Sequence, residues 1–229
     1  MSPREELKRR ARGISLGLYA GNLGALADTA RTAHGWGAQV LHFDEMDGNF
    51  VPGFLGGAPL VGAVRKALPQ AFLDVHLMHA QPEKQVGAYE KAGADLITVH
   101  AETTGAAEAL KAIRAAERPM LAGLALMPGT APDPALIALA DLVLVLSLDP
   151  RDGAAPDISA ACARLEALRE ATAATQTLLA FDGGVTLEVI EQIAASRPDL
   201  IVSGSAVMKQ EDPRAAFEQM AAAAHKTNP

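Results

Sequence analysis

Short apolar runs alternate with helix-like stretches along the whole chain, and this alternation restricts the possible folds more than any other feature. The stretches between the runs carry apolar residues at spacings of three and four, which is typical of amphipathic helices. The pattern predicts parallel strands joined by crossover helices. The expected strands are residues 14–18, 39–44, 72–78, 95–100, 120–126, 141–147, 177–182 and 199–204.

Eight strand–helix units in 229 residues favour a closed (β/α)8 TIM barrel. No linker-like segment divides the chain, so we expect a single domain over residues 1–229. An open doubly wound sheet would show the same alternation, but its G-x-G-x-x-G fingerprint is absent. In a barrel, chemistry occurs at the C-terminal ends of the strands, so polar residues there are candidates for an active site.

Charge and cysteine content exclude several classes of function. A formal net charge of −7 argues against a broad nucleic-acid-binding surface. The single cysteine, Cys162, cannot form an internal disulfide, which fits a reducing cytoplasm. The charged start of the chain has no apolar core, and the longest apolar stretch is interrupted by Asp141. We therefore expect a soluble cytoplasmic protein that binds neither nucleic acid nor membrane.

Histidines and aspartates stand at the C-terminal ends of several expected strands. Side chains alternate along a strand, so His42 and Asp44 point the same way, and so do Asp74 and His76. Asp182 ends the seventh strand on the same rim. Each residue alone could be a hydrogen-bonded polar group of the core. Together they favour a site for Zn²⁺, Fe²⁺ or Mn²⁺, because buried charge needs a partner or a metal.

Three nearby polar residues are left out of this site. Glu45 is out of register with His42 and Asp44, so its side chain should point away from the barrel axis, and His79 should point away in the same manner. His100 ends the fourth strand. It could line the pocket or be a hydrogen-bonded histidine of the rim.

Six motifs follow one another over nearly the whole chain: "LHFDEMDGNFVPG", "LDVHLM", "GADLITVHAE", "GLALMPGTAP", "FDGGVTLEVI" and "VSGSAV". In this order and spacing they resemble the ribulose-phosphate 3-epimerase family. The first two are specific to that family, whereas Gly-Gly and Gly-Ser turns occur in many phosphate-binding barrels. The resemblance implies a TIM barrel of the ribulose-phosphate-binding type. It also implies an isomerase that inverts C3 of a ketose phosphate, converting ribulose 5-phosphate to xylulose 5-phosphate or acting on a related sugar phosphate.

By that resemblance, one divalent metal ion, Zn²⁺, Fe²⁺, Mn²⁺ or Co²⁺, is bound by His42, Asp44, His76 and Asp182, and no organic cofactor is needed. Asp44 and Asp182 are also the expected catalytic pair. Epimerisation beside a ketone removes a carbon-bound proton from one face and returns one to the other, so two carboxyl groups on opposite sides are needed. The metal would stabilise the enediolate oxygens as a Lewis acid.

Further residues are expected to contact the sugar and its phosphate. Met46 and Met78 match methionines that line the family's site, although either could simply fill the core. The turns after strands seven and eight stand where barrels commonly bind phosphate through backbone N–H groups. The expected substrate- and phosphate-binding residues are Met46, Met78, Ser147, Arg151, Gly153, Gly183, Gly184, Gly204 and Ser205.

The loop after the sixth strand departs most from the family pattern. Where the family has a glycine-rich flap of the type N-P-G-F-G-G-Q, this chain reads "LDPRDGAAPD", with Asp149, Arg151 and Asp152 in place of glycines and the aromatic residue. Arg151 could grip the phosphate with its guanidinium or be an exposed loop charge. Gly17 stands where the family has a serine that contacts substrate. Changed substrate contacts around an unchanged metal set suggest retained chemistry on an altered sugar.

Other functions fit the residues in part. An epimerase of a different ketose phosphate, such as allulose 6-phosphate, is the nearest alternative. A sugar-phosphate decarboxylase of related fold would carry a D-x-K-x-x-D motif, which is absent. A non-catalytic phosphosugar-binding barrel is permitted by the changed loop but disfavoured by the intact metal set. Because barrels of this family usually associate, we also expect a homo-oligomer.

Overall fold

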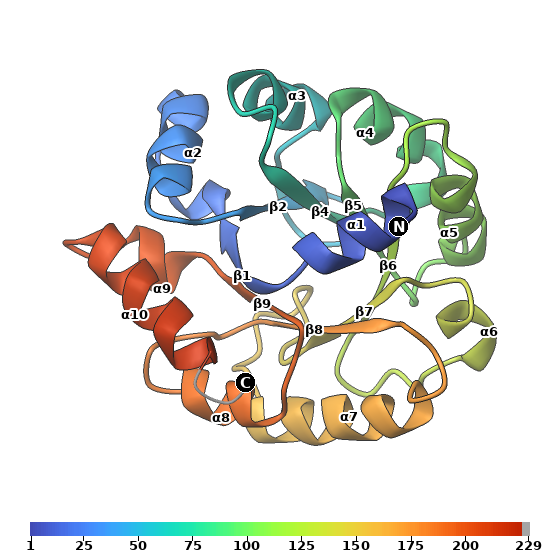
Figure 1. The fold of residues 1–229 in the computed structure, drawn as a ribbon. Coiled ribbons are helices and arrows are strands. Elements are labelled where there is room, and N and C mark those ends of the chain that lie inside the picture. The colour runs from blue at the N-terminus through green and yellow to red at the C-terminus, as the bar shows by residue number, and fades with distance from the viewer. Residues whose placement is uncertain (226–229) are drawn as a thin grey trace.

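A computed structural model describes residues 1–225 and shows a closed parallel barrel (Figure 1). The barrel strands pair in parallel with their neighbours, and the pairing of β1 (Gly13–Gly17) with β2 (Val40–Asp47) closes the ring. The predicted (β/α)8 TIM barrel is confirmed. The parallel strands are β1 (Gly13–Gly17), β2 (Val40–Asp47), β4 (Phe72–Met78), β5 (Leu96–His100), β6 (Leu121–Leu126), β7 (Leu142–Leu146), β8 (Leu178–Asp182) and β9 (Leu200–Ser203).

Helices surround the barrel and cover the outer faces of the strands (Figure 1). The apolar stripes predicted from the sequence face the sheet. Leu110 and Ile113 of α5 (Ala106–Ala115) are buried, and so are Leu165 and Leu168 of α7 (Ile158–Ala171). Within the described residues, no helix combines the length and apolar content needed to cross a membrane. The outer helices are α2 (Leu26–Gly35), α3 (Ala58–Ala67), α4 (Val86–Ala92), α5 (Ala106–Ala115), α6 (Pro134–Ile137), α7 (Ile158–Ala171), α8 (Ile190–Ala195), α9 (Ser205–Met208) and α10 (Pro213–His225).

Strand β2 continues to Asp47, beyond its expected end at residue 44, because a short strand pairs with it. This strand, β3 (Phe54–Leu55), runs antiparallel to the end of β2 and places Met46 opposite Leu55. The Asp47 carboxylate accepts the N–H groups of the next residues in the turn, Asn49 and Phe50, at 2.8 Å each. The resulting hairpin orders the segment that follows His42 and Asp44.

An additional helix, α1 (Pro3–Arg10), closes the N-terminal end of the barrel (Figure 1). Sequence analysis noted only the charge of this segment. The Ser2 hydroxyl accepts the N–H of Glu5, and the Glu5 carboxylate accepts the N–H of Ser2, which is a capping box. Leu7 and Ala11 pack into the apolar cluster inside the barrel. The helix therefore plugs the end of the barrel opposite the expected active site.

The barrel interior changes from apolar to polar along its axis. Its N-terminal part is filled by residues such as Val40 of β2 and Phe72 of β4, which are register partners. Further along the same two strands, His42 is paired with Asp74 and then Asp44 with His76. Residues two apart face the same side of a strand, so this register carries the polar set to the C-terminal rim.

Three aspartates precede strands at the N-terminal end, and we call Asp95, Asp141 and Asp199 the strand-start aspartates. Each carboxylate accepts a backbone N–H from the neighbouring strand, those of Leu73, Ala122 and Leu179, at 2.8, 3.0 and 2.9 Å respectively. Each also pairs with basic side chains. These pairs are Asp95 with Arg65 and Arg118, Asp141 with Arg4, Lys8 and Arg114, and Asp199 with Arg12.

Candidate active site

Four side chains converge at the C-terminal rim, and we call His42, Asp44, His76 and Asp182 the His/Asp quartet. One nitrogen or oxygen atom of each lies within 4.8 Å of the others. Asp44 Oδ1 is 3.2 Å from His42 Nε2 and 3.3 Å from His76 Nδ1. Asp182 Oδ2 is 3.7 Å from His76 Nδ1. The structure thus brings together the four residues that the sequence selected as metal ligands.

The orientation of His42 is fixed by a buried carboxylate. Its Nδ1 lies 2.7 Å from Asp74 Oδ2, and the Ser15 hydroxyl donates to the same oxygen at 2.7 Å. A carboxylate behind a histidine in this manner is typical of metal-binding histidines, because it holds the ring and directs the other nitrogen at the ion. Sequence analysis placed Asp74 on the same face of its strand as His76 but gave it no role. The sequence does not show that Asp74 is paired with His42 in the register of β2 and β4.

Burial and neighbouring groups shift the pKa values of the two quartet carboxylates in opposite directions. Burial favours the neutral form of Asp44, but the imidazoles of His42 and His76 outweigh burial and lower its pKa. Burial and the nearby charge of Asp44 raise the pKa of Asp182, against the smaller effect of the same imidazoles. The side chains of Asp44 and Asp182 are 37% and 18% exposed, so both remain reachable from solvent. Among the described residues, neither is paired with Lys or Arg.

A cavity of about 310 Å³ opens beside Asp44 and Asp182, and Gly17, Gly183, Gly184 and Gly204 form part of its lining. Gly183 has a φ of +98°, and a Cβ there would lie 2.6 Å from the Ser147 hydroxyl oxygen. A Cβ at Gly17 would lie 2.9 Å from the Cα of Gly204. Side chains at these positions would therefore force the wall of the cavity to move. The expected phosphate-binding residues in the lining are Gly183, Gly184, Gly204 and Ser205.

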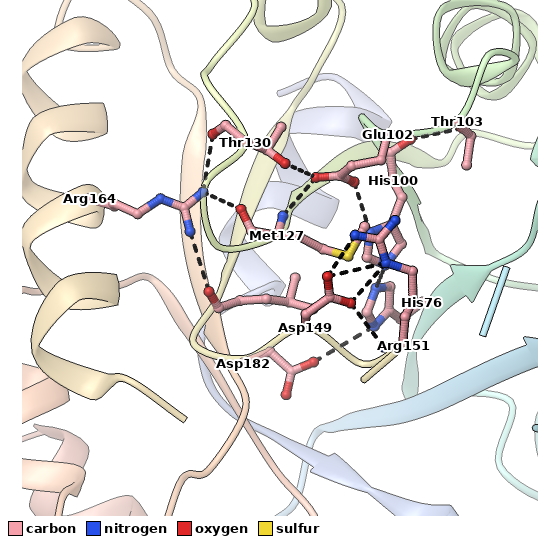
Figure 2. A network of polar contacts seen from close by, with 11 residues as sticks. His76, His100, Glu102, Thr103, Met127, Thr130, Asp149, Arg151, Arg164 and Asp182 are labelled. Atoms are coloured by element: carbon pink, nitrogen blue, oxygen red, sulfur yellow. Dashed lines mark hydrogen bonds and ion pairs between the residues drawn. The ribbon is translucent and has the colours of Figure 1, made fainter. Parts of the chain in front are cut away.

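The loop after β7 contains the remaining expected phosphate contacts. The Ser147 hydroxyl donates to the Gly183 carbonyl at 2.8 Å. The guanidinium of Arg151 is held by the Asp149 carboxylate, with Nη2 at 2.6 Å from Oδ2, and it lies on the His100 side of the site (Figure 2). Neither Arg151 nor the exposed Gly153 lines the cavity beside Asp182. Of the expected contacts in this loop, only Ser147 is bonded to a glycine turn.

The two expected wall methionines lie side by side in the register of β2 and β4. Met78 is buried, and Met46 is partly buried. Met46 lines a larger cavity of about 850 Å³ between the β2–β3 hairpin and α4, away from Asp182. A wall role for Met46 beside the quartet stays a prediction.

A chain of polar contacts leads outward from His76 (Figure 2). His76 Nε2 lies 2.9 Å from His100 Nε2, and His100 Nδ1 lies 3.1 Å from Glu102 Oε2. Burial lowers the pKa of His100 to about 4. Burial favours the neutral form of Glu102, but its hydrogen bonds outweigh burial and lower the pKa to about 2. Sequence analysis missed Glu102, although its position two residues after His100 was a usable signal.

Glu45 points away from the barrel axis, as its register predicts, yet it is fully buried. The hydroxyl groups of Tyr19 and Tyr89 each donate to its carboxylate at 2.7 Å, and the Gly57 N–H donates as well. Burial raises the pKa of Glu45 in spite of these donors. These hydrogen bonds connect β2 to Tyr19, to Tyr89 of α4 and to the backbone before α3. Glu45 is therefore not part of the quartet.

Comparisons with known proteins agree with this geometry. The model of the "Ribulose-phosphate 3 epimerase family" matches residues 13–208. The chain belongs to this family. The ribulose-phosphate 3-epimerase of Mycobacterium tuberculosis H37Rv is 36% identical over 211 residues, covering 89% of each chain. That of Bacillus subtilis is 31% identical over 216 residues, covering 90% of this chain and 97% of its own. The protein is thus a sugar-phosphate epimerase, an isomerase that acts on carbohydrates.

Solved structures of other enzymes share the epimerase's fold. A crystal structure of KGPDC from Streptococcus mutans has a TM-score of 0.72 and 15% identity, and covers 96% of this chain and all of its own. A crystal structure of 3-hexulose-6-phosphate synthase has a TM-score of 0.68 and 21% identity, and covers 92% of this chain and 99% of its own. At these identities the likeness concerns the barrel alone.

Proposed function

We propose that this epimerase inverts C3 of a ketose phosphate and that it depends on one divalent metal ion. The observation that carries this proposal is the convergence of Asp44 and Asp182 with two imidazoles beside a single cavity. The first candidate reaction is the interconversion of ribulose 5-phosphate and xylulose 5-phosphate, as in the named relatives. The altered loop around Asp149 and Arg151 supports a second candidate substrate, a related ketose phosphate such as allulose 6-phosphate.

The donor set of the His/Asp quartet fits a divalent transition metal. Two imidazole nitrogens and two carboxylate oxygens suit Zn²⁺, Fe²⁺, Mn²⁺ and Co²⁺. The buried Asp74 behind His42 adds the carboxylate that commonly supports such a ligand. When bound, the metal supplies positive charge that stabilises the negative charge developing on the substrate oxygens.

In the proposed reaction, Asp44 and Asp182 exchange protons with opposite faces of C3. One carboxylate removes the C3 proton, and the electron pair of the broken C–H bond forms a C2–C3 double bond while charge moves to the C2 oxygen. The other carboxyl group gives its proton to the opposite face of C3 and becomes a carboxylate. The electron pair of the C2–C3 double bond forms the new C–H bond, and the C2 carbonyl is restored. A single base would return the proton to the face from which it came, so inversion requires both residues.

The glycine turns after β8 and β9 are the proposed phosphate site. Gly183, Gly184, Gly204 and Ser205 line the same cavity as both catalytic carboxylates, and their backbone N–H groups are the proposed phosphate donors. Ser147 supports the turn through its bond to Gly183. We retain Arg151 and Gly153 as a second group of phosphate contacts, which requires Arg151 to release Asp149. Met46 and Met78 are retained as apolar contacts of the sugar. A single domain over residues 1–229, a homo-oligomeric state and a cytoplasmic location complete the proposal.

The test is incorporation of solvent deuterium at C3. The protein is stripped with a chelator, reloaded with each of the four metals in turn, and incubated in D₂O with ribulose 5-phosphate, allulose 6-phosphate or a ketose without phosphate. We expect label in a ketose phosphate only with metal, and its loss in Asp44→Asn. Asp28→Asn, an exposed change on α2, is the matched control.

Each part of the proposal can be refuted by a separate result. No label in any ketose phosphate would refute the epimerase proposal. Full activity after metal removal would refute metal dependence, and equal labelling of the ketose without phosphate would refute the phosphate site.

A further inference from the structure

The imidazole rings of His76 and His100 share one hydrogen atom. The two Nε2 atoms are 2.9 Å apart, so one ring must donate and the other must accept. The rings are 1% and 0% exposed, which leaves no room for water to take either role. The position of this hydrogen decides which nitrogen of His76 keeps a lone pair.

Glu102 determines which ring donates. Its Oε1 accepts the backbone N–H of Met127 at 2.8 Å and the Thr130 hydroxyl at 2.5 Å. Its Oε2 faces His100 Nδ1 at 3.1 Å. An ionised carboxylate can only accept, so His100 Nδ1 must carry a hydrogen, and His100 Nε2 then offers a lone pair. His76 Nε2 is therefore the donor of the shared hydrogen.

We propose that Glu102 is a positioning residue that acts through His100 to keep the shared hydrogen on Nε2 of His76. Nδ1 is then the one ring nitrogen of His76 that can bind a metal ion. It is also the nitrogen that faces the quartet, at 3.3 Å from Asp44 Oδ1 and 3.7 Å from Asp182 Oδ2. This inference rests on the proposed metal site and explains how the chain prepares one of its ligands.

The two histidines of the quartet present opposite ring nitrogens, and each is selected by a carboxylate. Asp74 contacts Nδ1 of His42 directly, which leaves Nε2 for the metal. Glu102 selects Nδ1 of His76 through an intervening imidazole. The intervening ring is needed because His76 Nε2 faces His100 on the next strand, β5, rather than an acidic residue.

Glu102→Gln is the decisive variant because it keeps the shape of the side chain but changes its acceptors. The amide oxygen must accept the Met127 N–H, so the NH₂ group faces His100 Nδ1 and requires a lone pair there. The shared hydrogen then moves to His100 Nε2, and His76 is left with its hydrogen on Nδ1. Loss of such a partner behind a metal ligand costs about 10- to 100-fold in metal affinity. We expect that loss in titrations with Mn²⁺ alone.

Glu117→Gln is the matched control, since it makes the same chemical change at an exposed residue between α5 and β6, at the other end of the barrel. Its Mn²⁺ affinity should equal that of the unaltered protein. Unchanged Mn²⁺ affinity in a folded Glu102→Gln variant would overturn the proposal.

The shared hydrogen can also be located directly by ¹⁵N NMR of the metal-free, unaltered protein. One-bond N–H coupling should assign it to His76 Nε2, with signals identified from His76→Gln and His100→Gln. In Glu102→Gln it should appear on His100 Nε2. Finding it on His100 in the unaltered protein would overturn the proposal.

A purely structural role for Glu102, holding Met127 and Thr130, would lower stability without moving the hydrogen. That result would overturn the proposal too. The NMR measurement on the unaltered protein needs no turnover, so its failure is distinguishable from failure of the proposed function.

Discussion

The two ends of the barrel use aspartate in opposite ways. At the N-terminal end, each strand-start aspartate accepts a strand N–H and pairs with at least one basic side chain. At the C-terminal end, Asp44 and Asp182 face imidazoles and each other. Within residues 1–225, neither has an arginine or lysine partner. The same side chain is therefore neutralised at one end and left reactive at the other.

This difference separates stability from chemistry in the fold. A carboxylate paired with guanidinium groups and a backbone N–H is held in place by charge-assisted hydrogen bonds. A carboxylate beside imidazoles, another carboxylate and a cavity can exchange a proton or bind a cation. Charge-removing changes at the two ends should therefore have different consequences, and the following changes test that expectation.

Asp182→Asn should have the largest effect on activity and little effect on stability. Removing one acid/base group lowers turnover by about 10²- to 10⁴-fold. The neutral amide also removes the repulsion between Asp182 and Asp44, so the metal-free variant should unfold at the same or a higher temperature. C3 exchange rates and thermal unfolding measure the two effects. An unchanged exchange rate would contradict the assigned role.

Asp95→Asn should show the reverse behaviour. It leaves the partly buried Arg65 and Arg118 without their shared carboxylate, at a cost of about 3–5 kcal/mol in the free energy of unfolding. The exchange rate per folded molecule should not change, because Asp95 is at the far end from the quartet. Denaturant unfolding provides the measurement. Asp28→Asn removes an exposed pair with Arg31 and should cost less than about 1 kcal/mol.

Glu102 should make stability depend on acid pH. Its pKa is lowered from 4.5 to about 2, so its contribution is complete above pH 4.5 and is lost as pH falls towards 2. The shift corresponds to about 3 kcal/mol. The stability advantage over Glu102→Gln should therefore shrink across this range, as followed by urea unfolding at several pH values. An advantage that stays constant would mean that Glu102 is not held as the charged form.

Apart from the Asp28→Asn control, Leu7→Ala should have the smallest of these effects. Leu7 is 8% exposed and packs at the closed end of the barrel, so its truncation should cost about 2 kcal/mol of unfolding free energy. Turnover of the folded protein should remain unchanged because α1 does not contact the quartet. A large loss of activity in a fully folded variant would show that the two ends are coupled.

The amount that the sequence could predict differs between the fold and the site. Periodicity identified the parallel strands, and spacing of two along a strand put His42 with Asp44 and Asp74 with His76. The α1 helix was missed although its signal, Ser2 followed by Pro3 and Glu5, is local. The partners of Glu45 could not be predicted, because Tyr19 and Tyr89 come from distant parts of the chain and meet only after folding.

The sequence by itself determined which residues share a face of each strand, because side-chain alternation is a local property of the extended backbone. The motifs of the sequence also determined the family. Only the tertiary structure decided which faces meet. The strand register placed Asp74 beside His42, side-chain packing between β4 and β5 brought His100 to His76, and closure of the barrel brought Asp182 to Asp44. Such contacts depend on the alignment and order of strands, which no short segment of the chain encodes.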